Sequence, residues 1–317
     1  MGDGGQISKP SAYGSKLKWF LSLCFVLSSL SCSRNKAEVI VYTSQDQVYA
    51  RPLFDRFERA TGIRVRAVYD SEAVKAAQIA NRLLLERAHP VADVFWNNEA
   101  MRTQQLAAAN VFDEREPIRS FGFRSRRLVI NTNLVALTEA PRRFSDLTNQ
   151  VWKGKFGMAY PVFGTTATHF YMLRERLGEE AWRQFCRLLA GNDALVLDGN
   201  SLVVKQVARG EIALGMTDID DIRAGQREGY PIEGLPLMED GMLIPNTAAL
   251  VAGAPNRERG IQFLNYLTSD VSITYLREKG ALEGADAGQA ASSKLNWSNV
   301  LEQLDETTRF LSEAFHR

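Results

Sequence analysis

Small polar side chains follow five apolar segments of the chain, at the points where predicted strands end and loops or helices begin. They are hydroxyls, amides and carboxylates, and they include no catalytic nucleophile paired with a base. The first backbone N–H groups of a helix have no partner inside it, so such a junction can hold an anion or a polar ligand. We therefore predict a ligand-binding site built from Ser44, Gln45, Asn98, Glu99, Gly164, Thr165, Thr166, Asn200, Ser201, Thr217, Asp218, Asp220 and Asp221.

A purely structural role is the alternative for several of these residues. Ser44, Thr165 or Thr166, and Ser201 could each be an ordinary helix N-cap, which is worth about 1 kcal/mol. Residues 198–200 have the composition of a common turn. The prediction of a site depends instead on shared placement, because ligands of open α/β sheets bind beyond the carboxyl ends of the strands.

Catalytic and cofactor motifs are missing from the sequence. There is no serine–histidine–acid set, metal-binding histidine pair, phosphate-binding loop or dinucleotide glycine motif. His169 has no second histidine nearby, so a packed or solvated imidazole is expected. A transferase using Asp220 or Asp221 as the base with His169 is the enzymatic alternative, and it lacks a nucleophile and a cofactor motif. We predict a protein that is not an enzyme and has no cofactor.

The body of the chain alternates between strand and helix patterns. Residues 39–42 are continuously apolar, as in a buried parallel strand. A helix follows with Tyr49, Leu53 and Phe57 at four-residue spacing, and Gly62 is placed to end it. The further predicted strands are 63–67, 93–96, 157–160, 195–197 and 212–216. The further predicted helices are 71–88, 166–177, 179–189, 201–209, 261–267 and a charged one near 301–311.

Two such α/β series contain more residues than a single hydrophobic core usually accommodates, so we predict two lobes. The chain is expected to cross between them at 127–131 and 242–245. The predicted divisions are a signal peptide at 1–31, a first lobe at 32–125 and 244–280, a second lobe at 126–243, and a C-terminal linker and helix at 281–317.

The N-terminus predicts export from the cytoplasm. A weakly basic region precedes the uncharged apolar stretch 19–31, which is shorter than the roughly 20 residues of a membrane-spanning helix but fits a secretory signal. Residues 29–32 resemble a lipoprotein cleavage box with Cys32 as the lipid-bearing residue. A short buried helix is the alternative.

Cleavage before Cys32 would remove three lysines and one aspartate, which changes the formal charge from +1 to −1. This near-neutral balance gives no electrostatic reason to expect nucleic-acid binding. Cys186 would then be the remaining thiol, packed as a small apolar side chain.

The strand-end loops, in their order along the chain, resemble the periplasmic solute-binding proteins of ABC importers, in the branch usually described as ferric-iron-binding. The resemblance runs from about residue 38 to 280. The matching stretches are 41–50, 92–99, 152–155, 163–169, 198–201, 215–221 and 244–247.

The resemblance implies a type II-like periplasmic-binding-protein fold, in which two hinge strands join two α/β lobes around a ligand cleft. It also implies a monomer in the periplasm, attached to the membrane only through a lipid on Cys32, that delivers its ligand to an ABC permease. Without that lipid the protein would be free in the periplasm. A ligand sensor with the same fold is an alternative role.

Ligand identity is the open part of the resemblance. Iron binders of this family hold Fe³⁺ with two adjacent tyrosines in the loop that here reads 217–221 and contains none. The carboxylates of Glu99, Asp218 and Asp220 are then the predicted metal ligands, with Fe³⁺ and a synergistic anion as the transported ligand. The family's anion-holding role matches Gly164 to Thr166, Asn200 and Ser201, together with Arg124 or Arg126. The alternative ligand is a small phosphorylated, phosphonate or zwitterionic organic solute.

Overall fold

The computed structural model describes residues 1–2, 4–6, 37–69, 77–237, 241–285 and 295–315. It divides into two units, Met1–Ala37 and Glu38–Arg317, and the second unit carries the fold. The predicted signal peptide, Cys32 and the start of the predicted helix 71–88 lie outside the described residues. In the part of the chain that the structure describes, no helix has the length and apolar character needed to cross a membrane.

The first half of the sheet is mainly parallel. Strand β1 (Glu38–Thr43) lies between β2 (Arg64–Tyr69) and β3 (Val94–Asn97), both parallel to it, and β9 (Leu243–Leu250) joins β3 in the antiparallel sense. The helices of this half are α2 (Gln47–Thr61), α3 (Ala77–Leu85), α4 (Met101–Ala108), α9 (Arg257–Leu267) and α10 (Asp270–Lys279), with the 3₁₀ turn η3 (Glu86–Ala88). Gly62 ends α2 as predicted, with a left-handed φ of 71°.

The second half of the sheet repeats this design. Strand β5 (Phe156–Ala159) is parallel to β6 (Leu195–Leu197) and β7 (Leu214–Asp218). Strand β8 (Ile232–Pro236) pairs with β4. The helices are α5 (Gly164–Leu177), α6 (Glu179–Gly191), α7 (Asn200–Ala208) and α8 (Ile219–Arg227), with the 3₁₀ turns η4 (Phe144–Thr148) and η5 (Gln150–Trp152).

Strand β4 (Arg119–Asn131) belongs to both halves. Its residues from Arg119 to Ser125 pair with β9, and those from Arg126 to Asn131 pair with β7 and β8. Beside this change of partner, the Arg126 amide donates to the Met242 carbonyl at 2.8 Å. The chain therefore passes between the halves along β4 and again just before β9.

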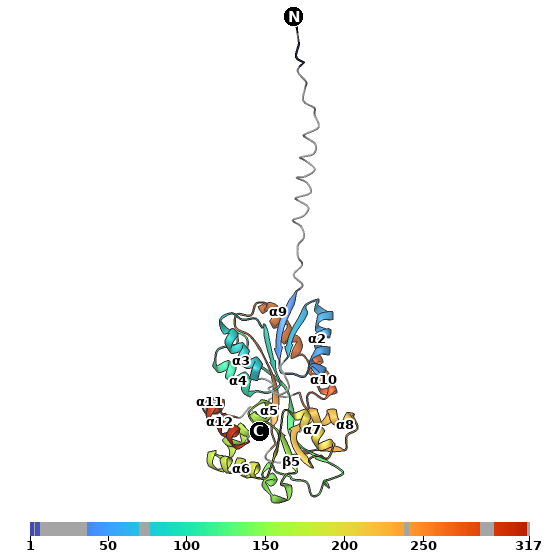
Figure 1. Ribbon diagram of the computed structural model, residues 1–317, viewed down its shortest axis with the longest axis vertical. Helices are drawn as coiled ribbons and strands as arrows, with labels where there is room; N and C mark the ends of the chain where they lie inside the picture. Colours follow the sequence, from blue (N-terminus) through green and yellow to red (C-terminus); the bar gives the residue numbers. More distant parts are fainter. Residues whose placement is uncertain (3, 7–36, 70–76, 238–240, 286–294, 316–317) are drawn as a thin grey trace. The chain divides into compact units, whose positions relative to one another are not determined.

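We call the elements on β1, β2, β3 and β9 the first lobe, and those on β5 to β8 the second lobe. Figure 1 shows the two groups at opposite ends of the second unit, with β4 and β9 running between them. The fold is thus the expected two-lobed α/β fold with two connecting strands.

Each lobe has an apolar core of its own. In the first lobe Tyr42, Phe95 and Phe112 are buried together. In the second lobe Trp182 and Phe185 pack with Phe310, Leu311 and Phe315 of the C-terminal segment. That segment forms two helices, α11 (Trp297–Glu302) and α12 (Leu304–Ala314), where the sequence predicted one.

Cys186, which the sequence placed in the interior, is buried, and so is His169, for which the sequence left a packed or a solvated ring open. Cys186 is a free thiol whose pKa is raised by burial, so it behaves as a packed apolar group. His169 is fully buried and stacks on Phe144 with ring centroids 5.3 Å apart.

A glycine in β7 permits the close packing of α7 on the sheet. A Cβ atom at Gly215 would overlap the side chain of Val203 and lie 3.0 Å from the Gly157 carbonyl. We predict that Gly215→Ala lowers the free energy of unfolding by about 1–3 kcal/mol, as other overpacked cores do. Urea unfolding measures this change. Gly191→Ala is the control, because a Cβ atom there meets open space, and equal effects of the two substitutions would contradict the prediction.

Candidate functional site

A cavity that is open to solvent lies where the two lobes meet. Its second-lobe wall comes from the ends of β5, β6 and β7 and the starts of the helices that follow them. Its first-lobe wall comes from the loops after β1 and β3. The lining residues are Asp46, Asn98, Arg124, Ala159, Tyr160, Phe163, Gly164, Thr165, Thr166, Asp198, Gly199, Asn200, Asp218, Asp220 and Asp221.

Helices α5 and α7 begin at this cavity without a side-chain cap. Their N-cap residues are Phe163 and Gly199, which have no polar side chain to offer. Because the first turn of a helix carries unpaired N–H groups and a partial positive charge, both starts can accept an anion. Thr165 and Thr166, considered above as possible caps, lie instead within the first turn of α5.

The two remaining cavity helices begin at aspartates. Asp46 is the N-cap residue of α2 and Asp218 that of α8, and neither side chain caps its own helix. Ser44 and Ser201 are not N-caps either, since they lie before Asp46 and within α7. In each of these four helices the side chain of the N-cap residue makes no capping hydrogen bond with its own helix.

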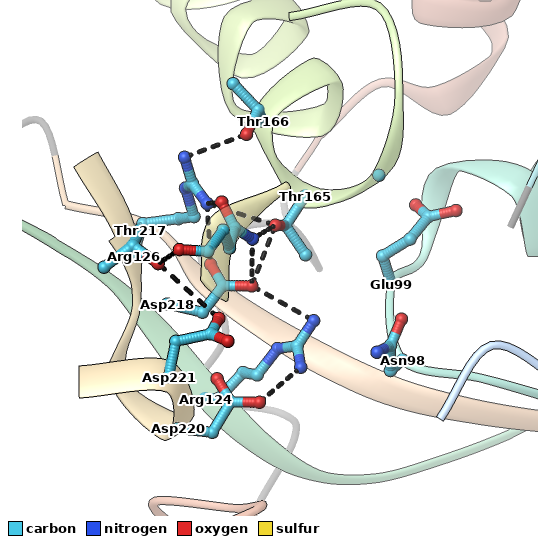
Figure 2. A network of polar contacts seen from close by, with 12 residues as sticks. Asn98, Glu99, Arg124, Arg126, Thr165, Thr166, Thr217, Asp218, Asp220 and Asp221 are labelled. Atoms are coloured by element: carbon cyan, nitrogen blue, oxygen red, sulfur yellow. Dashed lines mark hydrogen bonds and ion pairs between the residues drawn. The ribbon is translucent and has the colours of Figure 1, made fainter. Parts of the chain in front are cut away.

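Two arginines from β4 are buried around Asp218 (Figure 2). Arg126 Nη1 lies 2.8 Å from Asp218 Oδ1, and Arg124 Nη2 lies 3.1 Å from Asp218 Oδ2. Arg124 Nη1 also donates to Asp220 Oδ2 at 2.9 Å. These arginines leave β4 on either side of its change of partner, so the charge network lies at the junction of the lobes.

Thr165 and Asn200 tie the network to the two helix starts. The Thr165 hydroxyl donates to Asp218 Oδ2 at 2.8 Å, and the Asn200 amide donates to the same oxygen at 3.1 Å. Arg126 in turn donates to Thr166 Oγ1 at 3.1 Å and to Asn200 Oδ1 at 3.0 Å. Asp218 thus positions the starts of both α5 and α7.

The environment sets the charge state of this network. Burial disfavours ionised Asp218, but Arg124 and Arg126 outweigh it and hold the pKa of Asp218 below its ordinary value. Burial likewise disfavours the Arg124 cation, but Asp220 and Asp218 outweigh it and raise the pKa of Arg124. Asp218 and Arg124 are therefore ionised at neutral pH.

Asp220 is the exception among the buried acids. Burial, which Arg124 only partly offsets, together with the charges of Asp218 and Asp46, raises the pKa of Asp220 from 3.8 to about 6. Its Oδ1 atom is buried and has no hydrogen-bond partner among the described residues. Asp220 thus offers a spare acceptor at the cavity.

Most of the first-lobe predictions support the cavity wall without lining it. Ser44 Oγ donates to Asn98 Oδ1 at 2.9 Å, and only Asn98 of this pair lines the cavity. Gln45 is buried away from the lining, and its amide atoms have no partner in the described part of the chain. Asp46, which the sequence prediction omitted, faces the cavity instead.

Glu99 is engaged in capping α4. Its carboxylate accepts the amides of Met101 at 2.6 Å and Arg102 at 3.0 Å, and also the Thr168 hydroxyl at 3.0 Å. The side chain is fully buried, is not part of the cavity lining, and stands apart from the aspartates in Figure 2.

Three carboxylates that could bind one cation together lie at the end of β7 and in the first turn of α8. Oxygens of Asp218, Asp220 and Asp221 all lie within 4.8 Å of one another. Asp218 and Asp220 were predicted as metal ligands, whereas Asp221 takes the place expected for Glu99, which is not in this group. Arg126, Ser201 and Thr217 lie behind the lining, where Arg126 and Thr217 bond to residues that form it.

Some of the cavity residues that the prediction missed have a signal in the sequence, and others have none. Asp198 and Gly199 immediately precede Asn200 in a loop already identified, so a wider window would have included them. Ala159, Tyr160 and Phe163 are apolar or aromatic residues near the end of β5, and no polar pattern indicates them.

This combination of two α/β lobes, two connecting strands and a polar cavity between strand ends defines a solute-binding protein. The sequence matches the model of the bacterial extracellular solute-binding protein family over residues 38–281. The chain belongs to this family.

Two of the relatives found by sequence comparison are named for different ligands. The chain is 22% identical over 255 residues to the major ferric iron-binding protein of Neisseria gonorrhoeae, which covers 73% of this chain and 76% of that protein. It is 27% identical over 251 residues to a putative 2-aminoethylphosphonate-binding periplasmic protein of Salmonella typhimurium. The aligned region covers 74% of this chain and 73% of that protein.

Solved structures share the fold at low sequence identity. Iron-bound HitA from Pseudomonas aeruginosa superposes with a TM-score of 0.77 at 17% identity, covering 88% of this chain and 99% of HitA. AfuA from Actinobacillus pleuropneumoniae, solved with fructose-6-phosphate, superposes with a TM-score of 0.72 at 17% identity. The superposition covers 88% of this chain and 98% of AfuA.

Removing the charge of Asp218 should destabilise the fold. We predict that Asp218→Asn lowers the free energy of unfolding by about 3–5 kcal/mol, because two buried guanidinium groups lose their shared carboxylate. The matched control is Asp193→Asn, whose side chain is 65% exposed and lies 3.6 Å from Lys153, and it should change stability by about 0–1 kcal/mol. Chemical denaturation compares the two, and a loss no larger than the control's would contradict the role of the network.

Asp220 should give ligand-free stability a distinctive pH dependence. Its pKa is higher in the folded protein, so its contribution is complete below about pH 4 and is lost as the pH rises through about 6. The pKa of Asp218 is lower in the folded protein than its ordinary value of 3.8. Its contribution to stability is therefore complete above pH 3.8 and is lost only as the pH falls through the pKa of the folded protein.

We predict that Asp220→Asn removes a fall in stability between about pH 4 and 6 that the wild type shows. Unfolding in urea across this pH range measures both proteins, and Asp193→Asn again serves as the control. Parallel curves for the wild type and Asp220→Asn would contradict the assignment.

Proposed function

We propose that the protein captures a small organic solute that carries a phosphate, phosphonate or carboxylate group together with an amine, and presents it to an ABC permease. One observation carries this proposal. The starts of α5 and α7, whose N-cap residues Phe163 and Gly199 have no polar side chain, line the same cavity as the carboxylates of Asp46, Asp220 and Asp221.

The helix starts suit the anionic end of such a solute. Anion oxygens gain hydrogen bonds from the first-turn N–H groups of a helix and a favourable interaction with its dipole. In α5 these N–H groups belong to Gly164, Thr165 and Thr166, all of which line the cavity. The glycine adds no side chain between its backbone and the ligand.

The carboxylates suit the cationic end. Five aspartates line the cavity, compared with one lining arginine and a second arginine behind it. Asp218 is already neutralised by Arg124 and Arg126, whereas one oxygen of Asp220 has no hydrogen-bond partner in the part of the chain that the structure describes. An ammonium group beside Asp220 and Asp221 would supply the missing positive charge and hydrogen-bond donors.

Ferric iron held with an anion is the second candidate ligand. It is favoured by the close spacing of carboxylate oxygens of Asp218, Asp220 and Asp221, which could bind one cation together, and by the names of several relatives. Against it, Asp218 already bonds two guanidinium groups, which would repel a trivalent cation. Tyr160 is the single tyrosine among the lining residues, so a pair of phenolate ligands is not available there.

The transport role would follow from closure of the lobes on the ligand, with affinity set by how strongly the ligand favours the closed form. The mature protein would begin at Cys32 and be held to the cell envelope by a lipid on that residue. Ligand sensing and catalysis are the remaining roles for such a cavity.

Thermal melting against a ligand panel tests the proposal, because a ligand that binds only the folded protein raises the melting temperature. We predict stabilisation by 2-aminoethylphosphonate and less by ethylphosphonate, which lacks the amine. Asp221→Asn should weaken binding of 2-aminoethylphosphonate by about tenfold and leave ethylphosphonate unchanged, since a charge-assisted hydrogen bond is worth about 1.5–3 kcal/mol. Asp193→Asn should behave as the wild type.

Other results would favour the alternatives. Stabilisation by Fe³⁺ with citrate, accompanied by a visible charge-transfer band, would support iron held by a tyrosine. The absence of any shift with phosphates, phosphonates and carboxylates would exclude the proposed anion site.

A further inference from the structure

Helix α5 connects the cavity to a second contact between the lobes. Its first turn lines the cavity, and one turn later Thr168 reaches α4 of the first lobe. The hydroxyl of Thr168 donates to Glu99 Oε2 at 3.0 Å, with both residues almost fully buried. A rigid helix therefore carries ligand contacts and an interlobe hydrogen bond on successive turns.

Glu99 is fixed to the first lobe. Besides its bonds to the amides of Met101 and Arg102, its Oε1 atom accepts the Asn97 side-chain amide at 3.2 Å. The carboxylate thus holds its position whether or not Thr168 is present. A displacement of the first lobe would separate Glu99 from Thr168 without leaving Glu99 unpaired.

An apolar cluster surrounds this hydrogen bond. Met101 of α4 packs with Ala167 and Tyr171 of α5 and with Val300 and Leu304 of the C-terminal helices. All five are buried. The cluster joins the first lobe, the second lobe and the C-terminal segment, so opening the lobes at this point would expose it.

The C-terminal helices are attached to the second lobe. The Tyr171 hydroxyl donates to the Leu304 carbonyl at 3.0 Å, and Arg174 forms an ion pair with Glu306 at 3.2 Å. Asn299 donates to Glu175 at 2.5 Å. Helix α11 also contacts α4 of the first lobe, so the segment covers the line along which α4 and α5 meet.

We propose that this α4–α5 contact, made of Glu99, Thr168 and Met101 and covered by α11 and α12, is a latch that holds the lobes together and thereby sets ligand affinity. Glu99 and Thr168 are positioning residues in this mechanism and do not touch the ligand. The proposal builds on the solute-binding function, and its ligand-free test does not depend on which solute is bound.

The decisive variant is Thr168→Val, which keeps the shape and burial of the side chain and removes the hydroxyl. Glu99 keeps its backbone partners, so no buried charge is left unpaired. Thr168→Ser restores the hydroxyl and should restore the wild-type behaviour. Thr61→Val is the control, because the Thr61 hydroxyl donates to the Phe57 carbonyl and accepts the Ile63 amide, both within the first lobe.

In the ligand-free protein, fluorophores on Leu85→Cys and Leu188→Cys report the separation of the lobes. Both positions are exposed, Cys186 is buried, and Cys24 and Cys32 are replaced by serine. We expect a mainly short separation in the wild type, Thr168→Ser and Thr61→Val, and a shift towards longer separations in Thr168→Val. An unchanged distribution in Thr168→Val, or a wild type that shows only the long separation, would overturn the latch.

Binding of 2-aminoethylphosphonate gives the second test. A hydrogen bond to a charged acceptor predicts that Thr168→Val weakens binding about tenfold, mainly through faster dissociation. Unchanged affinity and dissociation in Thr168→Val would contradict the latch even where the wild type binds. A wild type that does not bind this probe would contradict the proposed ligand class, and the fluorescence test would still decide on the latch.

Discussion

The pairing of Arg124 and Arg126 with Asp218 is the interaction on which the rest of the site depends. Two guanidinium groups and a carboxylate are nearly inaccessible to water here, so each is tolerable only in the presence of the others. The arginines come from the strand that joins the lobes, and the aspartate ends β7 and begins α8. The network therefore fixes the position of three helix starts relative to the connecting strand, and the cavity is the space that these starts leave open.

The charge network also restricts which kinds of ligand fit the cavity. The network neutralises Asp218, whereas Asp220 keeps one oxygen without a hydrogen-bond partner among the described residues, and the first-turn N–H groups of α5 and α7 face the cavity. A ligand that satisfies both must carry opposite charges on different groups. A bare metal ion would satisfy the carboxylates alone, and would do so within reach of two guanidinium groups.

Much of this arrangement follows from the sequence. The alternation of strand and helix patterns predicts two α/β lobes, and the rule that ligands bind beyond strand ends predicts that Thr165, Asn200 and Asp218 lie together. The rule does not indicate the direction of side chains within a loop. Asn98 and Glu99 are adjacent, yet one faces the cavity and the other caps α4, because that helix, absent from the predicted elements, leaves backbone amides within reach of the carboxylate. Long-range packing of the C-terminal helices has no local signal either.

A crystal structure of the protein with 2-aminoethylphosphonate and Fe³⁺ both supplied tests the central claim most directly. We predict phosphonate oxygens at hydrogen-bond distance from the first-turn amides of α5 and an ammonium group beside Asp220 and Asp221, with no iron in the cavity. Iron bound among Asp218, Asp220 and Asp221, with the phosphonate absent from the helix starts, would contradict it.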